Sequence, residues 1–384
     1  MADLQVEFDT TAEAGELDRP VERRPPAPPS ISEPGPEPPA PEAPVSERPV
    51  PEPPAPDPLR RARALLAAHP VADGYSGLPW ALRALPWYDL ELGDSAVDAD
   101  VPRLRAGGVG AQFWSLHVPE SITGDQVLAA TLEQLDLVKH VVGRHSEGLR
   151  LAHTASEVAD ARHCGRIAAL IGPARAEAIG DSLATLRALH TLGLCSLTLS
   201  GTSWAGPEGL TPFGEEVVRE LNRLGVLAEL TGASEATAHR VLAVSRAPVL
   251  FTRSGARALR DAPANLPDDL LAALGAAKGL CLVPLAAEQT GISVSEVADH
   301  LDHVRRVAGP ECVGLSGMYD TPAAHPEGLA DTSRYPHLVA ELMERDWSDE
   351  DLARLTWGNV QRVLRGVDFA ARAARERRRR QAAD

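Results

Sequence analysis

The chain has 384 residues, a formal net charge of −16 and 44% hydrophobic residues. This length allows either two or three average domains or one α/β barrel with tails. The acidic balance argues against nucleic-acid binding, and no stretch is apolar enough to predict a membrane-spanning helix. Residues 1–9 lack the basic and apolar regions of a secretory signal, so we expect a cytoplasmic protein.

The first 58 residues differ in composition from the rest of the chain. Seventeen of the 33 prolines lie within residues 20–58, and residues 1–58 carry 13 acidic side chains against four arginines. Such a segment cannot bury enough apolar surface to offset its chain entropy. We therefore predict a disordered arm over 1–58, a barrel over 59–370, and a solvated, frayed basic tail over 371–384.

From residue 59 onward, short apolar segments alternate with longer amphipathic ones. The predicted strands are 70–75, 109–116, 167–171, 196–199, 226–230, 249–252, 280–285 and 313–316. The predicted helices are 59–68, 124–145, 181–192, 212–224, 234–244, 267–274, 293–307, 335–345 and 352–374. Eight strand–helix units favour a closed (β/α)8 barrel, and no glycine-rich phosphate motif supports an open nucleotide-binding sheet.

Reactive groups of such a barrel are expected where its strands end. Asp73 is the only residue of the first strand end that can offer a charge to a substrate, and His117 is the one histidine expected near the mouth. The Ser203 segment follows a strand but lacks the second glycine of a nucleophile elbow. The residues expected to form a pocket here are Tyr75, His117, Glu177, Trp204, Glu229, Arg253, Met318, Tyr319 and Asp320.

Two further groups of residues are interpreted as structural. Asp299, His300, Asp302 and His303 lie within a predicted outer helix, so we expect a solvated helix face there and no metal site. The four cysteines are widely spaced in apolar surroundings, which predicts reduced core thiols and no disulfide.

Several motifs carry a family resemblance. The segment 73–80 reads Asp-Gly-Tyr-Ser-Gly-Leu-Pro-Trp and the segment 107–114 reads Gly-Gly-Val-Gly-Ala-Gln-Phe-Trp. With segments 210–226, 245–249, 265–269 and 297–303, they resemble the renal (membrane) dipeptidase family of zinc metallopeptidases over about residues 68–368. The resemblance implies a (β/α)8 barrel of the metal-dependent hydrolase kind, commonly a homodimer.

The resemblance also implies where metal ligands should stand. The family has a His-x-Asp metal pair after the first strand, where this chain has Tyr75 and Gly77. The family's metal-bridging glutamate falls on Ala174, and its two further metal-binding histidines fall on Gly232 and Arg253. None of these replacements supplies the ligand that zinc takes in the family, so the sequence predicts no bound zinc.

The substrate-binding positions of the family are replaced as well. By the resemblance, the substrate-binding histidine falls on Gly201 and the carboxylate-binding arginine on Ala264. The acid/base aspartate falls on Met318, whereas a second aspartate of the same motif is present as Asp320. The resemblance therefore implies that both the metal site and the substrate site have changed.

Three functional interpretations follow. In the first, the chain is an inactive pseudo-peptidase that acts as a binding, scaffold or regulatory protein, as a homodimer or with a related dipeptidase, and needs no cofactor. The second is a zinc-dependent dipeptidase, and the third is a metal-free enzyme with new acid/base residues drawn from His117, Glu177, Glu229 and Asp320. Arg253 is expected to pair internally with Asp320 or Glu229, the alternative being a small anionic ligand.

Overall fold

The computed structural model describes residues 57–94 and 96–381, together with Pro26 and Gly35. The predicted arm over 1–58 therefore lies almost wholly outside the described residues. The first continuous described segment starts at Asp57, whose side chain accepts a hydrogen bond from Leu59 N and caps the first helix.

All eight predicted strands are present, with ends that differ by at most two residues. The strands are β1 Val71–Ser76, β2 Val109–Trp114, β3 Leu149–Leu151, β4 Ile167–Ile171, β5 Ala174–Arg175, β6 Ser196–Thr198, β7 Ala205–Gly206, β8 Gly209–Leu210, β9 Leu227–Glu229, β10 Leu250–Phe251, β11 Leu280–Pro284 and β12 Val313–Ser316. Parallel pairing gives the orders β1-β2-β4-β3 and β12-β11-β10-β9-β6-β5. The sequence reasoning missed the short strands β3 and β5 and the β7–β8 hairpin.

Backbone hydrogen bonds join the two sheets into a barrel. On one side, Met318 N donates to Tyr75 O, and Ser76 bridges to Tyr319. On the other side, Cys195 N donates to Ile171 O at 2.8 Å. The predicted parallel barrel is therefore present, with the carboxyl ends of its strands gathered at one mouth.

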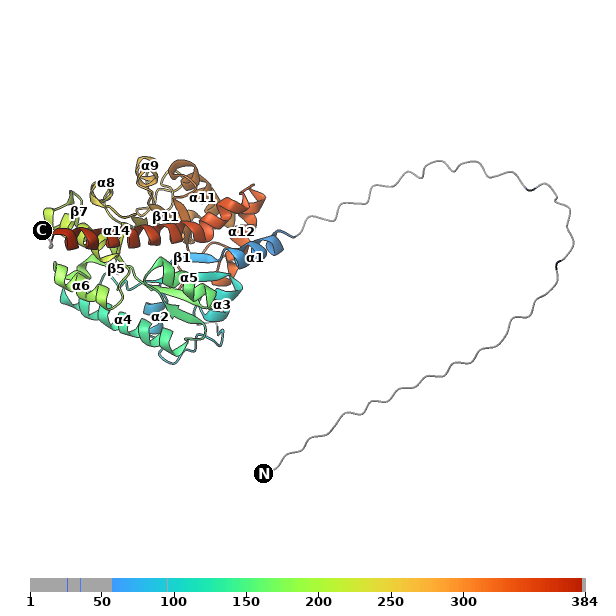
Figure 1. The fold of residues 1–384 in the computed structure, drawn as a ribbon, viewed down its shortest axis with the longest axis horizontal. Coiled ribbons are helices and arrows are strands. Elements are labelled where there is room, and N and C mark those ends of the chain that lie inside the picture. The colour runs from blue at the N-terminus through green and yellow to red at the C-terminus, as the bar shows by residue number, and fades with distance from the viewer. Residues whose placement is uncertain (1–25, 27–34, 36–56, 95, 382–384) are drawn as a thin grey trace, which may run out of the picture. The chain divides into compact units, whose positions relative to one another are not determined.

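Helices surround the barrel (Figure 1). They are α1 Pro58–Ala68, α2 Leu78–Leu82, α3 Val101–Ala106, α4 Asp125–Arg144, α5 Ala155–His163, α6 Leu183–Thr191, α7 Pro212–Leu224, α8 Glu235–Val244, α9 Asp268–Ala276, α10 Ala287–Thr290, α11 Val294–Ala308, α12 Tyr335–Glu344, α13 Asp349–Ala353 and α14 Asn359–Gln381. Short 3₁₀ turns cover Ala176–Ile179 and Thr332–Arg334, and a π-helical turn covers Arg354–Gly358. Every predicted helix is present, although the one expected over 352–374 is divided by the π-helical turn. In the described residues, no helix combines the length and apolarity that a membrane crossing requires.

Helix α14 closes the barrel at the end opposite the mouth. Val360, Val363 and Val367 of this helix pack in one cluster with Ala72 and Leu250, which face the barrel interior. Figure 1 shows α14 crossing the barrel in this position. The basic run expected to fray is instead helical as far as Gln381, because it continues a helix that is anchored by this buried face.

Two expectations about buried residues were wrong. His300 and His303 do not form a solvated face: both are buried, His300 Nδ1 lies 3.0 Å from Ala256 N, and His303 Nε2 lies 2.7 Å from Asp268. They share one helix face with the apolar core residues of α11, and this face packs against α9. Cys164 is exposed at the end of α5, whereas the other three thiols are free and buried.

Candidate functional site at the barrel mouth

An arginine and a tyrosine meet at the mouth. Tyr75 lies near the end of β1, and Arg253 follows β10. The guanidinium carbon of Arg253 lies 4.5 Å from the centroid of the Tyr75 ring, a cation–π contact. Met318 and Ala286 pack against Tyr75, so the cation lies beside apolar side chains.

Glu229 ties three strand ends together beneath this contact. Its carboxylate is fully buried and accepts hydrogen bonds from Thr198 Oγ1 at 2.6 Å, Thr231 N at 2.9 Å, and both N and Oγ1 of Thr252 at 3.0 Å. Arg253 Nη2 lies 3.7 Å from Glu229 Oε2. The structure thus contains the internal Arg253 pair that was expected, with Glu229 as the partner.

A cavity of about 330 Å³ opens next to this cluster. It is lined by His117, Glu120, Arg175, Glu177, Thr198, Ser200 and Gly201. Arg175 and Glu177 form an ion pair at 2.6 Å, so these two charges satisfy each other. Burial, followed by the positive charges of Arg253 and Arg175, lowers the pKa of His117 to about 3, and its Nδ1 is buried without a hydrogen-bond partner. His117 is therefore a neutral imidazole near physiological pH.

Only His117 and Glu177 of the nine residues predicted for the pocket line this cavity. Four others form or adjoin the Arg253 cluster described above: Tyr75, Glu229, Arg253 and Met318. The remaining three lie elsewhere in the walls of the mouth. Trp204 is buried and donates from Nε1 to Asp181 at 2.7 Å. Tyr319 is buried and donates its hydroxyl to Leu329 O at 3.1 Å. Asp320 turns toward the segment that precedes α3. Trp204 and Tyr319 thus satisfy their polar groups within the walls of the mouth, and none of the three side chains lines the cavity.

Asp73 is also absent from the opening, contrary to the sequence interpretation. Its carboxylate is fully buried and accepts hydrogen bonds from Gly317 N at 2.6 Å, Gln112 Nε2 at 2.8 Å and Tyr75 N at 3.2 Å. Burial raises the pKa of Asp73, and these hydrogen bonds partly oppose the rise. The group holds β1, β2 and the chain after β12 together and offers no charge to a ligand.

The glycines and alanine at the implied ligand positions differ in their surroundings. A Cβ atom added to Gly77 would lie 2.2 Å from the backbone oxygen of Asp320, so the chain itself occupies that space. Ala174 is fully buried in β5. Gly201 and Gly232 have φ values of 76° and 77°, a conformation that residues with side chains rarely adopt.

The chain after β12 and the loop after β10 complete the mouth. Met318 and Asp320 have φ values of 57° and 58°, and such left-handed backbone at residues other than glycine is strained. Ala264 is half-buried, and its neighbour Asn265 accepts a hydrogen bond from Gly255 N at 2.7 Å. Among the described residues, no three His, Cys, Asp or Glu side chains lie together in a way that could hold a metal ion.

Asp320 faces another carboxylate. Its Oδ1 accepts from Asp98 N at 2.8 Å, its own N donates to Asp98 Oδ2 at 3.3 Å, and its Oδ2 is buried without a partner. Burial, with a smaller contribution from the Asp98 charge, raises the pKa of Asp320 to about 7. The folded protein therefore holds a proton on Asp320 that the unfolded chain loses at lower pH.

We expect Asp320→Asn to stabilise the protein at about pH 8 by on the order of 2–4 kcal/mol, since three pKa units correspond to about 4 kcal/mol. The folded state binds more protons than the unfolded state between about pH 4 and 7, so wild-type stability falls as the pH rises through this range. Asparagine keeps the Oδ1 acceptor and tolerates left-handed backbone. Urea unfolding at several pH values measures the effect, and the exposed Asp261→Asn serves as the control. Equal pH profiles for wild type and Asp320→Asn would contradict the assignment.

Four residues that line the cavity were not predicted for the pocket. Glu120 lies in the segment after β2, Arg175 directly follows Ala174 at a strand end, and Thr198 and Ser200 end or follow β6. Their positions after strands were visible in the sequence. Their shared cavity was not, because the residues come from separate strand–helix units.

Comparisons with known proteins identify the family. Residues 59–378 match the model of the membrane dipeptidase family (peptidase family M19). Dipeptidase 3 of Homo sapiens is 39% identical over 331 residues, which cover 80% of this chain and 67% of that protein. The chain thus spans about two thirds of the length of this relative. Dipeptidase verJ of Clonostachys rogersoniana is 34% identical over 349 residues, covering 83% of this chain and 89% of that protein.

Solved structures agree with this match. The dipeptidase AC, a metallopeptidase, superimposes with a TM-score of 0.71 at 26% identity and covers 77% of this chain and 98% of its own. A metallopeptidase from Rhodobacter sphaeroides, liganded with a phosphinate mimic of the dipeptide L-Ala-D-Ala, gives 0.71 at 24% identity with 77% and 99% coverage. The barrel prediction is confirmed, and this chain belongs to the membrane dipeptidase family.

Proposed function

We propose that this protein is a catalytically inactive member of the family, retained as a binding or regulatory barrel. The observation that carries the proposal is the Arg253 side chain, which stacks on Tyr75 and pairs with Glu229 at the mouth. Both Tyr75 and Arg253 stand where the family resemblance implies metal ligands. A fixed guanidinium repels a divalent cation, so it opposes metal binding in its neighbourhood.

The other groups at the mouth do not fit a zinc ion either. Zinc sites in proteins use histidine, cysteine, aspartate or glutamate ligands, and a catalytic site has three of them. Glu229 already accepts four hydrogen bonds and Asp73 accepts three. Of the ligand types that line the cavity in the described residues, Glu177 is paired with Arg175, which leaves His117 and the exposed rim residue Glu120. One imidazole and one rim carboxylate are fewer than the three protein ligands of a catalytic zinc site.

The proposed loss of activity follows from the chemistry of peptide hydrolysis. A metallopeptidase relies on its metal ion to generate a hydroxide and to polarise the scissile carbonyl. In the cavity next to Arg253, no carboxylate of the described residues is hydrogen-bonded to the neutral His117 to orient its ring as a general base. The arrangement therefore offers neither a metal-activated nucleophile nor an oriented acid/base pair.

We expect purified protein to contain far less than one equivalent of zinc and to hydrolyse no dipeptide. The full chain would be incubated with zinc, desalted, and measured by elemental analysis. The same sample would be assayed against dipeptides whose first residue is L and whose second residue is either L or D. Dipeptides are the substrates to test, because the names of the relatives indicate dipeptidases. An active dipeptidase of the family, treated identically, is the positive control. Stoichiometric zinc, or turnover above the blank, would show that the protein is a metallopeptidase after all.

A further inference from the structure

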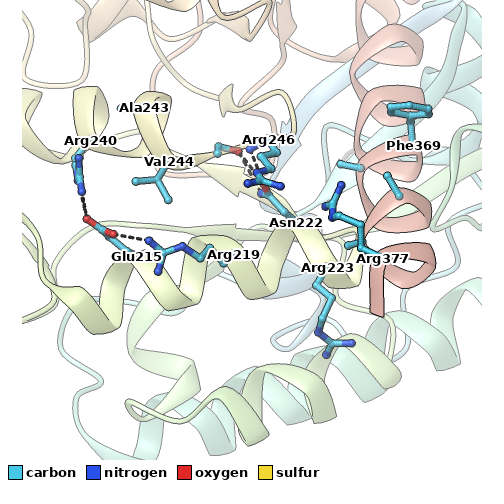
Figure 2. Close-up of a pocket in the computed structure, with 14 residues that line it drawn as sticks. Glu215, Arg219, Asn222, Arg223, Arg240, Ala243, Val244, Arg246, Phe369 and Arg377 are labelled. Atoms are coloured by element: carbon cyan, nitrogen blue, oxygen red, sulfur yellow. Dashed lines mark hydrogen bonds and ion pairs between the residues drawn. The ribbon is translucent and has the colours of Figure 1, made fainter. Parts of the chain in front are cut away.

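A second concave surface lies on the outer helices, apart from the cavity at the mouth. This groove has a volume of about 800 Å³ and runs between α7, the end of α8 and α14 (Figure 2). It is lined by Glu215, Arg219, Asn222, Arg223, Arg240, Ala243, Val244, Ser245, Arg246, Phe369, Ala370, Ala373, Ala374 and Arg377. The lining thus contains five arginines and one acidic residue, on a chain whose net charge is strongly negative.

Three of these arginines are partly neutralised by glutamates of α7. Arg240 and Arg219 both pair with Glu215, and Arg223 pairs with Glu220. These pairs fix the guanidinium groups along one wall of the groove. Because they are partly exposed, they remain accessible to a second anionic partner.

The remaining two arginines have no recorded partner within the described residues. Arg246 follows α8 and Arg377 lies on α14, both exposed, and neither takes part in an ion pair or a side-chain hydrogen bond there. In Figure 2 both side chains extend over the space between the end of α8 and α14. Two guanidinium groups on facing walls of one groove repel each other until an anion lies between them. Their planar geometry matches a carboxylate.

Apolar surface accompanies this charge. Phe369 is 70% exposed, and α14 also presents Ala373 and Ala374 to the groove, across from Val244. An exposed aromatic side chain next to arginines is a typical combination in protein interfaces. The arginines are spread along the groove, from Arg240 to Arg377, and are not focused on one point (Figure 2). An extended ligand fits this arrangement better than a single small anion.

We propose that this groove binds an acidic, partly apolar peptide segment of a partner protein. Carboxylates of the segment pair with Arg246 and Arg377, while its apolar side chains cover Phe369. A single-stranded nucleic acid is less well matched, because such sites stack successive bases on several aromatic side chains and the groove has one. The groove shares no lining residue with the cavity at the mouth, so this inference stands whether or not the protein is catalytically inactive.

The test is fluorescence anisotropy with the full chain and a labelled peptide in which glutamate alternates with leucine and phenylalanine. We expect saturable binding that weakens as salt is raised, since exposed charges are screened. The double variant Arg246→Glu/Arg377→Glu should weaken binding at least about tenfold, because it places repulsive charges against the peptide. Phe369→Ser should weaken it severalfold. Arg63→Glu, a charge reversal on the distant helix α1, is the matched control and should have no effect.

Altered peptides and two other polyanions distinguish an acidic, partly apolar peptide from other ligands of the groove. A peptide with glutamine in place of glutamate, and one with serine in place of the apolar residues, should both bind more weakly. Tighter binding of oligothymidylate or inorganic polyphosphate than of the acidic peptide would overturn the proposal in favour of a general polyanion site. Absence of peptide binding at low salt, or an equal loss in Arg63→Glu, would also overturn it. Circular dichroism of each variant confirms that the barrel is folded.

Discussion

Replacing Glu229 with alanine is expected to lower the free energy of unfolding by about 3–5 kcal/mol. The carboxylate is fully buried and joins β6, β9 and the chain after β10 through Thr198, Thr231 and Thr252. Without it, four donors lose their acceptor and Arg253 loses the carboxylate that balances its charge. Each buried group left without a partner bears its own desolvation penalty.

Chemical denaturation of the full chain measures this effect. Glu229→Gln, which keeps one carbonyl acceptor, should lose less stability and provides a folded comparison should the alanine variant fail to accumulate. Glu235→Ala is the matched control, because this glutamate forms a surface pair with Arg257 at 2.7 Å and should contribute less than about 1 kcal/mol. Equal losses for Glu229→Ala and Glu235→Ala would mean that the buried carboxylate does not organise the mouth.

Gly77→Ala is expected to destabilise the protein by about 3 kcal/mol or more, a large value for an added methyl group. The new Cβ would lie 2.2 Å from the Asp320 backbone oxygen, a distance that forces one of the two segments to move. Gly77 N also donates to Tyr319 O at 2.8 Å, so a displacement would disturb the closure between β1 and the chain after β12.

Thermal and urea unfolding of Gly77→Ala should be compared with Gly143→Ala. Gly143 lies within α4 and nothing approaches its Cβ position within 4 Å, so this substitution should raise stability by about 0.5–1 kcal/mol. If Gly77→Ala were as stable as wild type, the segment 318–320 would be able to move away from the new methyl group at little cost in free energy. If Gly77→Ala is destabilised as expected, an aspartate at position 77 would likewise require the backbone after β12 to move away from residue 77.

Sequence patterns were sufficient to predict the barrel. The segment 167–171 is a continuous apolar run, which is typical of a strand covered on both faces. Ser234, the first residue of the helix predicted over 234–244, is a typical capping residue and caps α8 in the structure. The three-residue strand β3 was missed because so short a segment shows no period. His300 was misplaced because two histidines three residues apart suggested a polar face, although Val297, Leu301 and Val304 mark that face as buried.

The site was less predictable, because its contacts join residues far apart in the chain. The sequence located Arg253 and Glu229 at strand ends and predicted that Arg253 pairs with either Asp320 or Glu229, of which the structure has Glu229. It could not indicate that Asp320 would turn toward Asp98, 222 residues away. Nor could it indicate that a backbone oxygen would fill the space beside Gly77, since this depends on the left-handed backbone at Met318 and Asp320.

The Arg253–Glu229 pair has a consequence for the thermodynamics of folding. When a diffusible ion holds strand ends together, the free energy of unfolding includes a mass-action contribution that grows with the logarithm of the ion concentration. Here the balancing cation is part of the chain, so its local concentration is set by covalent connection alone. Under the proposed loss of metal binding, the melting temperature of this barrel is expected to be the same in metal-depleted and in zinc-supplemented solution.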